Sequence, residues 1–206
     1  MGYFPFFIDI GGKPCTVIGG GKVALRKIEK LMPFGPKIKV VAPVICHEIE
    51  SIEGLELIRR KFSPSDIDGA FFVISATDDK ILSADIYSLC TGRNIPVNTV
   101  DDQEKCTFIF PAIVKKGDAA AAVSTSGKSP MFARFLRENI EELMSDKNME
   151  IMDAMGRARS YIKANYDTEE QRCRITRSLL EALIACDTVP DDDTIHNMIE
   201  SLTAAV

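Results

Sequence analysis

The chain has 206 residues, of which 46% are hydrophobic and 27% are charged, and its formal net charge is −5. This is the composition of a globular protein with enough chain for one good core and a smaller second unit, and it excludes a disordered or fibrous protein. The acidic balance also argues against general nucleic-acid binding, which needs a basic surface to displace counterions from phosphates.

The sequence points to a cytoplasmic protein without a membrane segment. No apolar run reaches the roughly 18 residues of a membrane-spanning helix, and the first residues lack the basic stretch of a signal peptide. The six cysteines form no C-x-x-C pair, so we expect reduced thiols. His47 and His196 lie far apart in the chain, and we therefore expect no metal site built from imidazoles.

The first half of the chain alternates β-rich runs with helical stretches, which is the pattern of βαβ units in a parallel sheet. Pro33 and Gly35 are expected to end the first helix, and Gly92 the second. The expected strands are 14–18, 38–42, 55–60, 70–75 and 96–98, and the expected helices are 23–32 and 79–91.

The pattern changes after Asp102. Two strand-like runs, 108–114 and 119–124, flank Gly117-Asp118 and predict a hairpin. Ser129-Pro130 supplies an N-cap and a first-turn proline for a helix over 131–144. Further helices are expected near 149–165, 168–186 and 192–203. The fold class is therefore α/β: a Rossmann-like parallel sheet, then a hairpin-plus-helix region, then a small helical domain.

A glycine-rich turn follows the first expected strand. In C-T-V-I-G-G-G-K-V-A, a buried strand stands directly before G-x-G-x-x-A and a helix directly after it, which is typical of a dinucleotide-binding turn. Gly19 allows the tight turn beside Gly20, Gly21 lets the backbone approach a diphosphate, and Ala24 permits close helix packing. The diphosphate would face the positive end of the helix. A glycine-rich turn that binds nothing is the competing interpretation.

Two further segments bear on the cofactor. In dinucleotide-binding domains, an acidic residue about 20 residues after the turn usually binds the ribose 2′-hydroxyl. Here Ala42-Pro43-Val44 stand at that place, so the residues alone do not decide between NAD and NADP. S-A-T-D-D ends the fourth strand with small residues that can line a cofactor crevice, and Thr77 is a candidate contact. An ordinary helix N-cap is an equally good interpretation of that segment.

The run V-N-T-V-D-D carries the fifth strand out through its carboxyl end, where ligands bind in open α/β sheets. Neighbouring side chains of an extended segment face opposite sides, so only one of Asp101 and Asp102 is expected at the crevice. A carboxylate there can accept a proton while a hydride leaves the substrate. A simple turn is the alternative for this pair.

The order of these motifs resembles that of the precorrin-2 dehydrogenase family, which includes the amino-terminal module of siroheme synthase and a fungal bifunctional dehydrogenase and ferrochelatase. The resemblance covers about residues 1–145 and runs through G-G-G-K-V-A-x-R-K, V-V-A-P, S-A-T-D-D, V-N-T-V-D-D-Q-E-K-C-T-F-I-F-P-A and A-V-S-T-S-G-K-S-P-M-F-A-R-F-L-R. It implies an enzyme that oxidises precorrin-2 to sirohydrochlorin with NAD, in siroheme biosynthesis. An enzyme that also inserts iron, and a non-catalytic NAD-binding redox sensor, are the alternatives.

The resemblance also implies roles for individual residues. It makes Asp101 the functional aspartate. It implies cofactor contacts at Lys22 and Val23, after the glycine turn, and at Pro43 and Val44, after the second strand.

A homodimer is implied as well, formed by exchange of the region after the nucleotide domain. The expected division is an NAD-binding Rossmann domain at 1–112, a dimerisation region at 113–145 and a helical domain at 146–206. Precorrin-2 is a polycarboxylate, and the S-T-S-G-K-S loop with the helix after it supplies candidate contacts, although a capping loop is the alternative for the hydroxyls. The substrate-binding candidates are Ser124, Lys128, Arg134 and Arg137.

Overall fold

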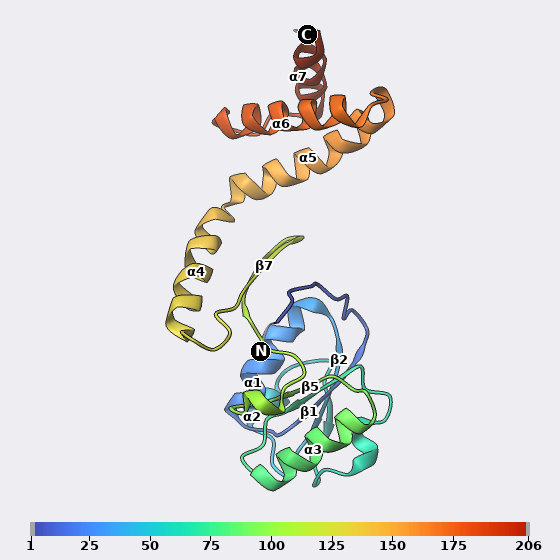
Figure 1. Cartoon of the computed structure of the whole chain (residues 1–206), viewed down its shortest axis with the longest axis vertical. Helices are drawn as coiled ribbons and strands as arrows, with labels where there is room; N and C mark the ends of the chain where they lie inside the picture. The colour runs from blue at the N-terminus through green and yellow to red at the C-terminus, as the bar shows by residue number, and fades with distance from the viewer. Residues whose placement is uncertain (1–2, 205–206) are drawn as a thin grey trace. The chain divides into compact units, whose positions relative to one another are not determined.

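The computed structural model describes residues 3–204. They form two compact units, one ending at Phe110 and the other beginning at Pro111. The first unit holds a parallel sheet with helices, and the second holds a hairpin followed by helices (Figure 1). Each unit has a buried hydrophobic core of its own.

A parallel sheet with the strand order β3-β2-β1-β4-β5 organises the first unit. This α/β, Rossmann-like architecture confirms the fold class that the sequence predicts. The strands are β1 (Pro14–Ile18), β2 (Lys37–Val41), β3 (Glu56–Ile58), β4 (Phe72–Ser75) and β5 (Val97–Thr99). The helices and short 3-10 turns are α1 (Lys22–Leu31), η1 (Met32–Phe34), α2 (His47–Glu50), η2 (Pro64–Ile67), α3 (Lys80–Gly92) and η3 (Gln103–Lys105).

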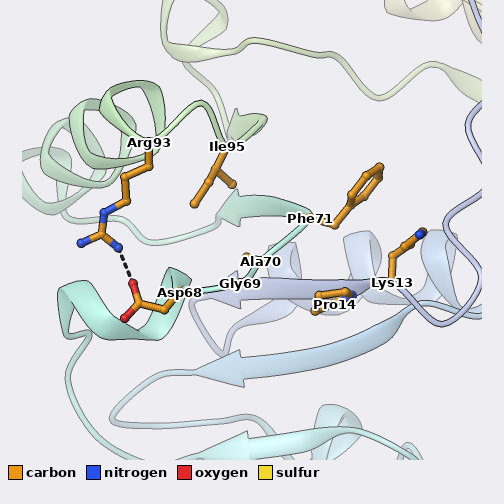
Figure 2. Close-up of a pocket in the computed structure, with 8 residues that line it drawn as sticks. All are labelled: Lys13, Pro14, Asp68, Gly69, Ala70, Phe71, Arg93 and Ile95. Atoms are coloured by element: carbon orange, nitrogen blue, oxygen red, sulfur yellow. Dashed lines mark hydrogen bonds and ion pairs between the residues drawn. The ribbon is translucent and has the colours of Figure 1, made fainter.

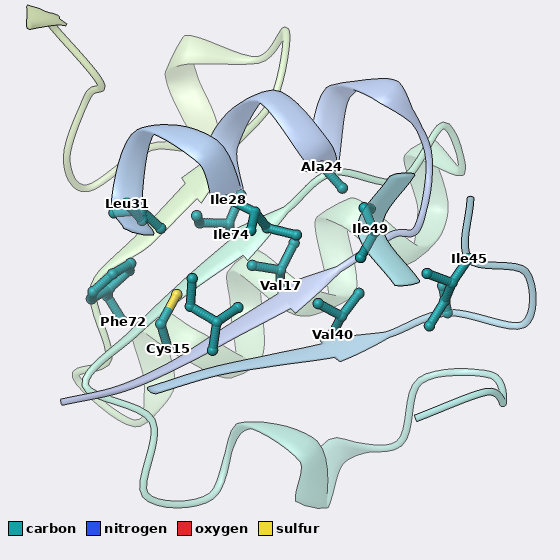
Figure 3. Close-up of a cluster of buried hydrophobic side chains, with 12 residues drawn as sticks. Cys15, Val17, Ala24, Ile28, Leu31, Val40, Ile45, Ile49, Phe72 and Ile74 are labelled. Atoms are coloured by element: carbon teal, nitrogen blue, oxygen red, sulfur yellow. The ribbon is translucent and has the colours of Figure 1, made fainter. Parts of the chain in front are cut away.

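Both faces of the sheet are buried. Successive side chains of each strand point to opposite faces, and each face packs against other elements. On one face, Val17 and Ile74 pack beneath Ile28 of α1 (Figure 3). On the other face, Val73 belongs to a cluster with Ile86 of α3. The strands therefore read as continuous apolar runs, and the register sets Ile18, Ser75 and Thr99 level at the carboxyl edge of the sheet.

The second unit combines an antiparallel hairpin with helices. Helix α4 packs against both hairpin strands, while α5, α6 and α7 pack on one another around Ala154, Leu179 and Ile199, all fully buried. The elements are β6 (Ala112–Lys116), β7 (Ala119–Val123), α4 (Pro130–Leu143), α5 (Asp146–Asn165), α6 (Glu169–Ala185) and α7 (Asp192–Ala204). Within the described part of the chain, no helix is both long and apolar enough to cross a membrane.

The structure corrects the expected elements in three places. β6 begins at Ala112 rather than at residue 108, because the Phe108 ring packs edge-on against Phe72 at 5.7 Å in the core of the first unit. Gly92 is the last residue of α3, and Asn94, with a φ of 56°, takes the left-handed conformation after it. The one-turn helix α2 was not predicted, since four residues are too few to show a helical period.

Asp66 anchors the η2 turn to the sheet. The Arg60 guanidinium donates hydrogen bonds to both of its carboxylate oxygens, at 2.8 and 2.6 Å, and the Ser63 N–H donates a third at 2.7 Å. The Thr16 hydroxyl of β1 donates to the Asp66 carbonyl at 3.1 Å. Asp66 is buried, and its hydrogen bonds to Arg60 are the main reason that its pKa lies below the ordinary range.

We predict that Asp66→Asn lowers the free energy of unfolding at pH 7 by about 2 kcal/mol, because it weakens a buried, charge-assisted hydrogen-bond network. The folded-state pKa lies below the unfolded value of about 3.9, so this stabilisation is complete above that pH and is lost as the pH falls below it. Urea unfolding of the wild type and of Asp66→Asn should show that the difference between their free energies of unfolding becomes smaller in acid. Asp68→Asn is the control, since the exposed Asp68–Arg93 pair contributes about 0.5 kcal/mol or less. A difference in free energy of unfolding that is the same at every pH would contradict this role of the ionised Asp66 carboxylate.

Candidate functional site

The three glycines of the turn have different surroundings. A Cβ on Gly19, whose φ is 124°, would lie 2.2 Å from the Ala76 carbonyl oxygen, and a Cβ on Gly20 would lie 2.2 Å from the Val44 carbonyl oxygen. A Cβ on Gly21 would meet nothing within 4 Å. Gly19 and Gly20 are therefore required by internal packing, and only Gly21 borders open space. The sequence predicted the tight turn at Gly19 but not the close packing at Gly20.

The start of α1 is suited to an anion. Gly21 is its N-cap, no side chain caps it, and the first turn holds no acidic residue. Its first N–H groups are thus left to solvent or a ligand, and the helix dipole is positive at this end. Ala24 is fully buried, which brings the helix close to the sheet as predicted. The exposed Lys22 and the half-buried Val23 follow the open position.

Two loops flank the glycine turn at the same edge of the sheet. In one, Pro43 and Val44 are exposed, Val44 to 80%, while the Cys46 N–H donates to the Gly20 carbonyl at 2.8 Å and holds the loop down. In the other, the Asp79 carboxylate caps α3, and the Thr77 hydroxyl accepts a hydrogen bond from the Asp79 N–H at 3.2 Å. Thr77 is therefore part of the capping turn, which is the second interpretation that the sequence allowed.

β5 ends in two buried polar atoms without hydrogen-bond partners among the described residues, Asn98 Oδ1 and Thr99 Oγ1. A buried polar group left without a partner costs about 1–3 kcal/mol. A group that reaches the end of β5 and supplies a hydrogen bond would recover that energy. Together with the open space over Gly21, these atoms make the carboxyl edge of the sheet suitable for a polar ligand.

The two aspartates after β5 differ in their surroundings. The strand ends at Thr99, and Asp101 lies in a turn with a φ of 60°, so the expected extended alternation through this pair is wrong. Asp102 accepts a hydrogen bond from Lys105 Nζ at 2.5 Å, and this bond is the largest cause of its lowered pKa. Asp101 is exposed and forms no ion pair with any residue in the described range. The turn, rather than strand pleating, separates the two carboxylates.

Lys27 lies near the candidate site, and the sequence analysis did not single it out. Its ammonium lies over the Phe110 ring, 4.1 Å from the centroid, and it makes no ion pair with any residue between 3 and 204. Partial burial is the main cause of its lowered pKa, and the nearby charge of Asp101 acts in the opposite direction. In the sequence, Lys27 is one of several charges on α1. Only the fold brings Phe110 and Asp101 near it.

The four substrate-binding candidates lie in the second unit. The Ser124 hydroxyl accepts from the Ser126 N–H at 3.1 Å, as in a local turn, and Lys128 is exposed. Arg134 pairs with Glu138 at 2.7 Å, and Arg137 pairs with Glu141 at 2.6 Å. Both arginines are therefore partly neutralised on their own helix.

A pocket of about 540 Å³ lies elsewhere in the first unit, at the amino ends of β1 and β4 (Figure 2). Two of its lining residues, Arg93 and Asp68, form an ion pair at 2.6 Å, and Lys13 lies 5.8 Å from the centre of the Phe71 ring. Ligands of open α/β sheets bind at the carboxyl edge, and the glycine turn and Asp101 lie at that edge. The candidate site is therefore the carboxyl edge and not this pocket.

Comparison with known proteins shows similarity to siroheme synthases. Siroheme synthase of Photorhabdus laumondii is 38% identical over 175 residues, covering 84% of this chain and 37% of the relative. Siroheme synthase of Zymomonas mobilis is 40% identical over 166 residues, covering 79% of this chain and 35% of the relative. The chain thus spans less than two-fifths of the length of these relatives. The resemblance to siroheme synthase is confirmed.

Among solved structures, SirC, precorrin-2 dehydrogenase, shares the fold with a TM-score of 0.67 at 22% identity, over 98% of this chain and 100% of that one. Two family models match the sequence. Residues 122–143 match the model described as sirohaem biosynthesis protein central, and residues 6–112 match the model described as putative NAD(P)-binding. Because the second match spans more than half of the chain and contains the whole glycine turn, the chain belongs to this putative NAD(P)-binding family.

Proposed function

We propose that the protein binds NAD at the glycine turn and dehydrogenates precorrin-2 to sirohydrochlorin. The observation that carries this proposal is the open space over Gly21 at the uncapped start of α1, on the same edge of the sheet as Asp101. The choice of substrate is supported by the name of SirC, which shares this fold, and by the siroheme synthase relatives. Anaerobic incubation with precorrin-2 and NAD, followed at the absorbance of NADH, is the direct test.

The residues around the turn fit a dinucleotide. The N–H groups at Gly21, Lys22 and Val23 would bind the diphosphate, because nothing else caps this helix end. Pro43 and Val44 would offer an exposed apolar surface to the adenosine half. When bound, NAD supplies the acceptor for the hydride of the substrate.

Asp101 is proposed to accept the proton that leaves precorrin-2 together with the hydride. It is exposed at the carboxyl edge of the sheet and forms no ion pair with any residue from 3 to 204. Asp102 is less suited as a base, because Lys105 occupies its carboxylate and lowers its pKa. Base catalysis of this kind accelerates a reaction by a factor on the order of 10² to 10⁴.

The carboxylates of the substrate need cationic and hydroxyl partners. We assign this role to Ser124, Lys128, Arg134 and Arg137. Lys128 is the strongest candidate of the four, since it forms no ion pair in the described part of the chain, whereas both arginines share their charge with glutamates.

All six cysteines are free thiols, and this supports a cytoplasmic place of action, where thiols stay reduced.

A homodimer is the second part of the proposal. Helix α4 exposes Met131, Phe132 and Phe135 to 73%, 53% and 56%, and the two rings stack with their centroids 6.0 Å apart. Contiguous exposed apolar side chains of this kind mark interaction sites. The proposed occupant is α4 and the hairpin of a second copy, as the family resemblance implies.

Gly21→Val should weaken NAD binding while the protein stays folded. Apart from its chain neighbours, a Cβ there would meet no described atom within 4 Å, so the branched side chain would extend into the space proposed for the diphosphate. We expect at least about a tenfold rise in the NAD dissociation constant by calorimetry, equal to roughly 1.4 kcal/mol, with an unchanged melting temperature. Gly20→Ala is the contrasting variant and should lower the melting temperature, because its Cβ collides with Val44. An NAD affinity of Gly21→Val equal to that of the wild type would refute the proposed cofactor site.

Asp101→Asn should reduce turnover roughly 100-fold or more, or about 2.7 kcal/mol of transition-state stabilisation, while NAD binding survives. Asparagine keeps the size of the side chain and tolerates a positive φ, so the turn should persist. Asp102→Asn is the matched control and should retain most of the activity. Wild-type rates for Asp101→Asn would remove its catalytic role, and a large loss only in Asp102→Asn would transfer that role to the neighbour.

Light scattering should report twice the mass of one chain at micromolar concentration. Phe132→Glu combined with Phe135→Glu should weaken the dimer roughly 100-fold or more, because buried aromatic anchors dominate interface energies. Ile184→Glu on α6 is the control, since it alters an equally exposed apolar side chain outside α4. A monomer mass for the wild type, or dissociation by the control alone, would refute the α4 interface.

A further inference from the structure

We propose that Cys106 is a positioning residue, whose thiol closes the turn between β5 and η3 and thereby holds the Asp101 carboxylate in place. The inference rests on the role of Asp101 in the proposed function. It concerns a residue that does not itself touch the substrate and acts through the backbone of the turn.

The Cys106 sulfur contacts the chain on both sides of Asp101. It accepts a hydrogen bond from the Thr99 N–H at 3.2 Å. It lies 3.1 Å from the Thr99 carbonyl oxygen and 3.2 Å from that of Asp102, and its single hydrogen can be donated to either. One thiol thus ties the residue that ends the strand to the residue that follows Asp101.

These contacts occur where the sheet is otherwise open. β5 is an edge strand, so alternate main-chain groups face away from β4. The Thr107 hydroxyl accepts from the Val97 N–H at 2.7 Å, and the Asn98 side-chain amide donates to the Phe108 carbonyl at 3.0 Å. Cys106 provides the third of these links, the one nearest to Asp101, and an isolated bridge pairs it with Asn98.

Asp101 needs such a closure because of its backbone. Its φ of 60° lies in the left-handed region, which is uncommon for residues other than glycine, although aspartate and asparagine adopt it more readily than most. With both ends tied by the thiol, the turn has little freedom to relax toward an extended conformation. Burial raises the pKa of Cys106, so the thiol keeps the hydrogen that it donates.

The test compares Cys106→Ala with Cys106→Ser, which keeps a donor and an acceptor, and with Cys186→Ala as a control thiol in the second unit. We expect Cys106→Ala to lower kcat tenfold or more with little change in NAD affinity, the serine variant to recover part of the loss, and the control to match wild type. A double-mutant cycle with Asp101→Asn separates positioning from general damage. If Cys106 acts through Asp101, removing the thiol costs nothing further in the Asp101→Asn background.

A second measurement does not depend on activity. Amide hydrogen exchange at Thr99 should accelerate tenfold or more in Cys106→Ala, because its N–H loses its acceptor, while exchange in α5 stays unchanged. Wild-type kcat for Cys106→Ala, or the same loss in both backgrounds of the cycle, would overturn the positioning role. If the wild-type protein itself fails to oxidise precorrin-2, the proposed function falls, and the Thr99 exchange alone decides whether the thiol closes the turn.

Discussion

The close packing of three loops at the carboxyl edge of the sheet is the constraint on which the rest of the first unit depends. Gly19 and Gly20 touch the loops after β4 and β2 so closely that a single methyl group would overlap a carbonyl oxygen in each. The absence of side chains at these two positions lets α1 start directly above the edge, with Ala24 against the strands. The uncapped helix end therefore opens outward at Gly21, where a ligand has room.

The same edge gathers groups that a buried sheet would normally avoid. Asn98 Oδ1 and Thr99 Oγ1 have no hydrogen-bond partner among residues 3–204, Asp101 has a positive φ, and Lys27 lies half-buried over an aromatic ring. The unpartnered atoms, the left-handed backbone and the partial burial of the Lys27 ammonium each cost stability, and such costs cluster where a protein binds or reacts. The remainder of this unit is conventional in comparison, with two apolar clusters and a buried, fully bonded Asp66. The apolar clusters and Asp66 thus stabilise the first unit, whereas the groups at the carboxyl edge of the sheet lower its stability.

Local patterns were sufficient for most of the fold. The βαβ alternation and the glycine turn predicted the parallel sheet, because buried parallel strands appear as short apolar runs and a dinucleotide turn needs glycines at set positions. Helices α4 to α7 were placed within a few residues of their bounds, since N-caps such as Ser129 and Thr168 are local signals. The run from Phe108 was read as part of a hairpin strand. An apolar run does not by itself reveal whether it pairs with a strand or packs into a core.

The sequence by itself determined the fold class and the position of the glycine turn, and it proposed two adjacent aspartates as candidates, because each depends on residue types at fixed short spacing. Only the tertiary structure decided how those aspartates differ. Lys105 occupies Asp102, a left-handed turn exposes Asp101, and Cys106 bonds to both sides of that turn. Lys27, far away in the sequence, lies close enough for the charge of Asp101 to affect its pKa. The alternation of an extended strand predicts none of these arrangements, because they depend on how the chain turns after the edge strand β5 and on how α1 packs on the sheet.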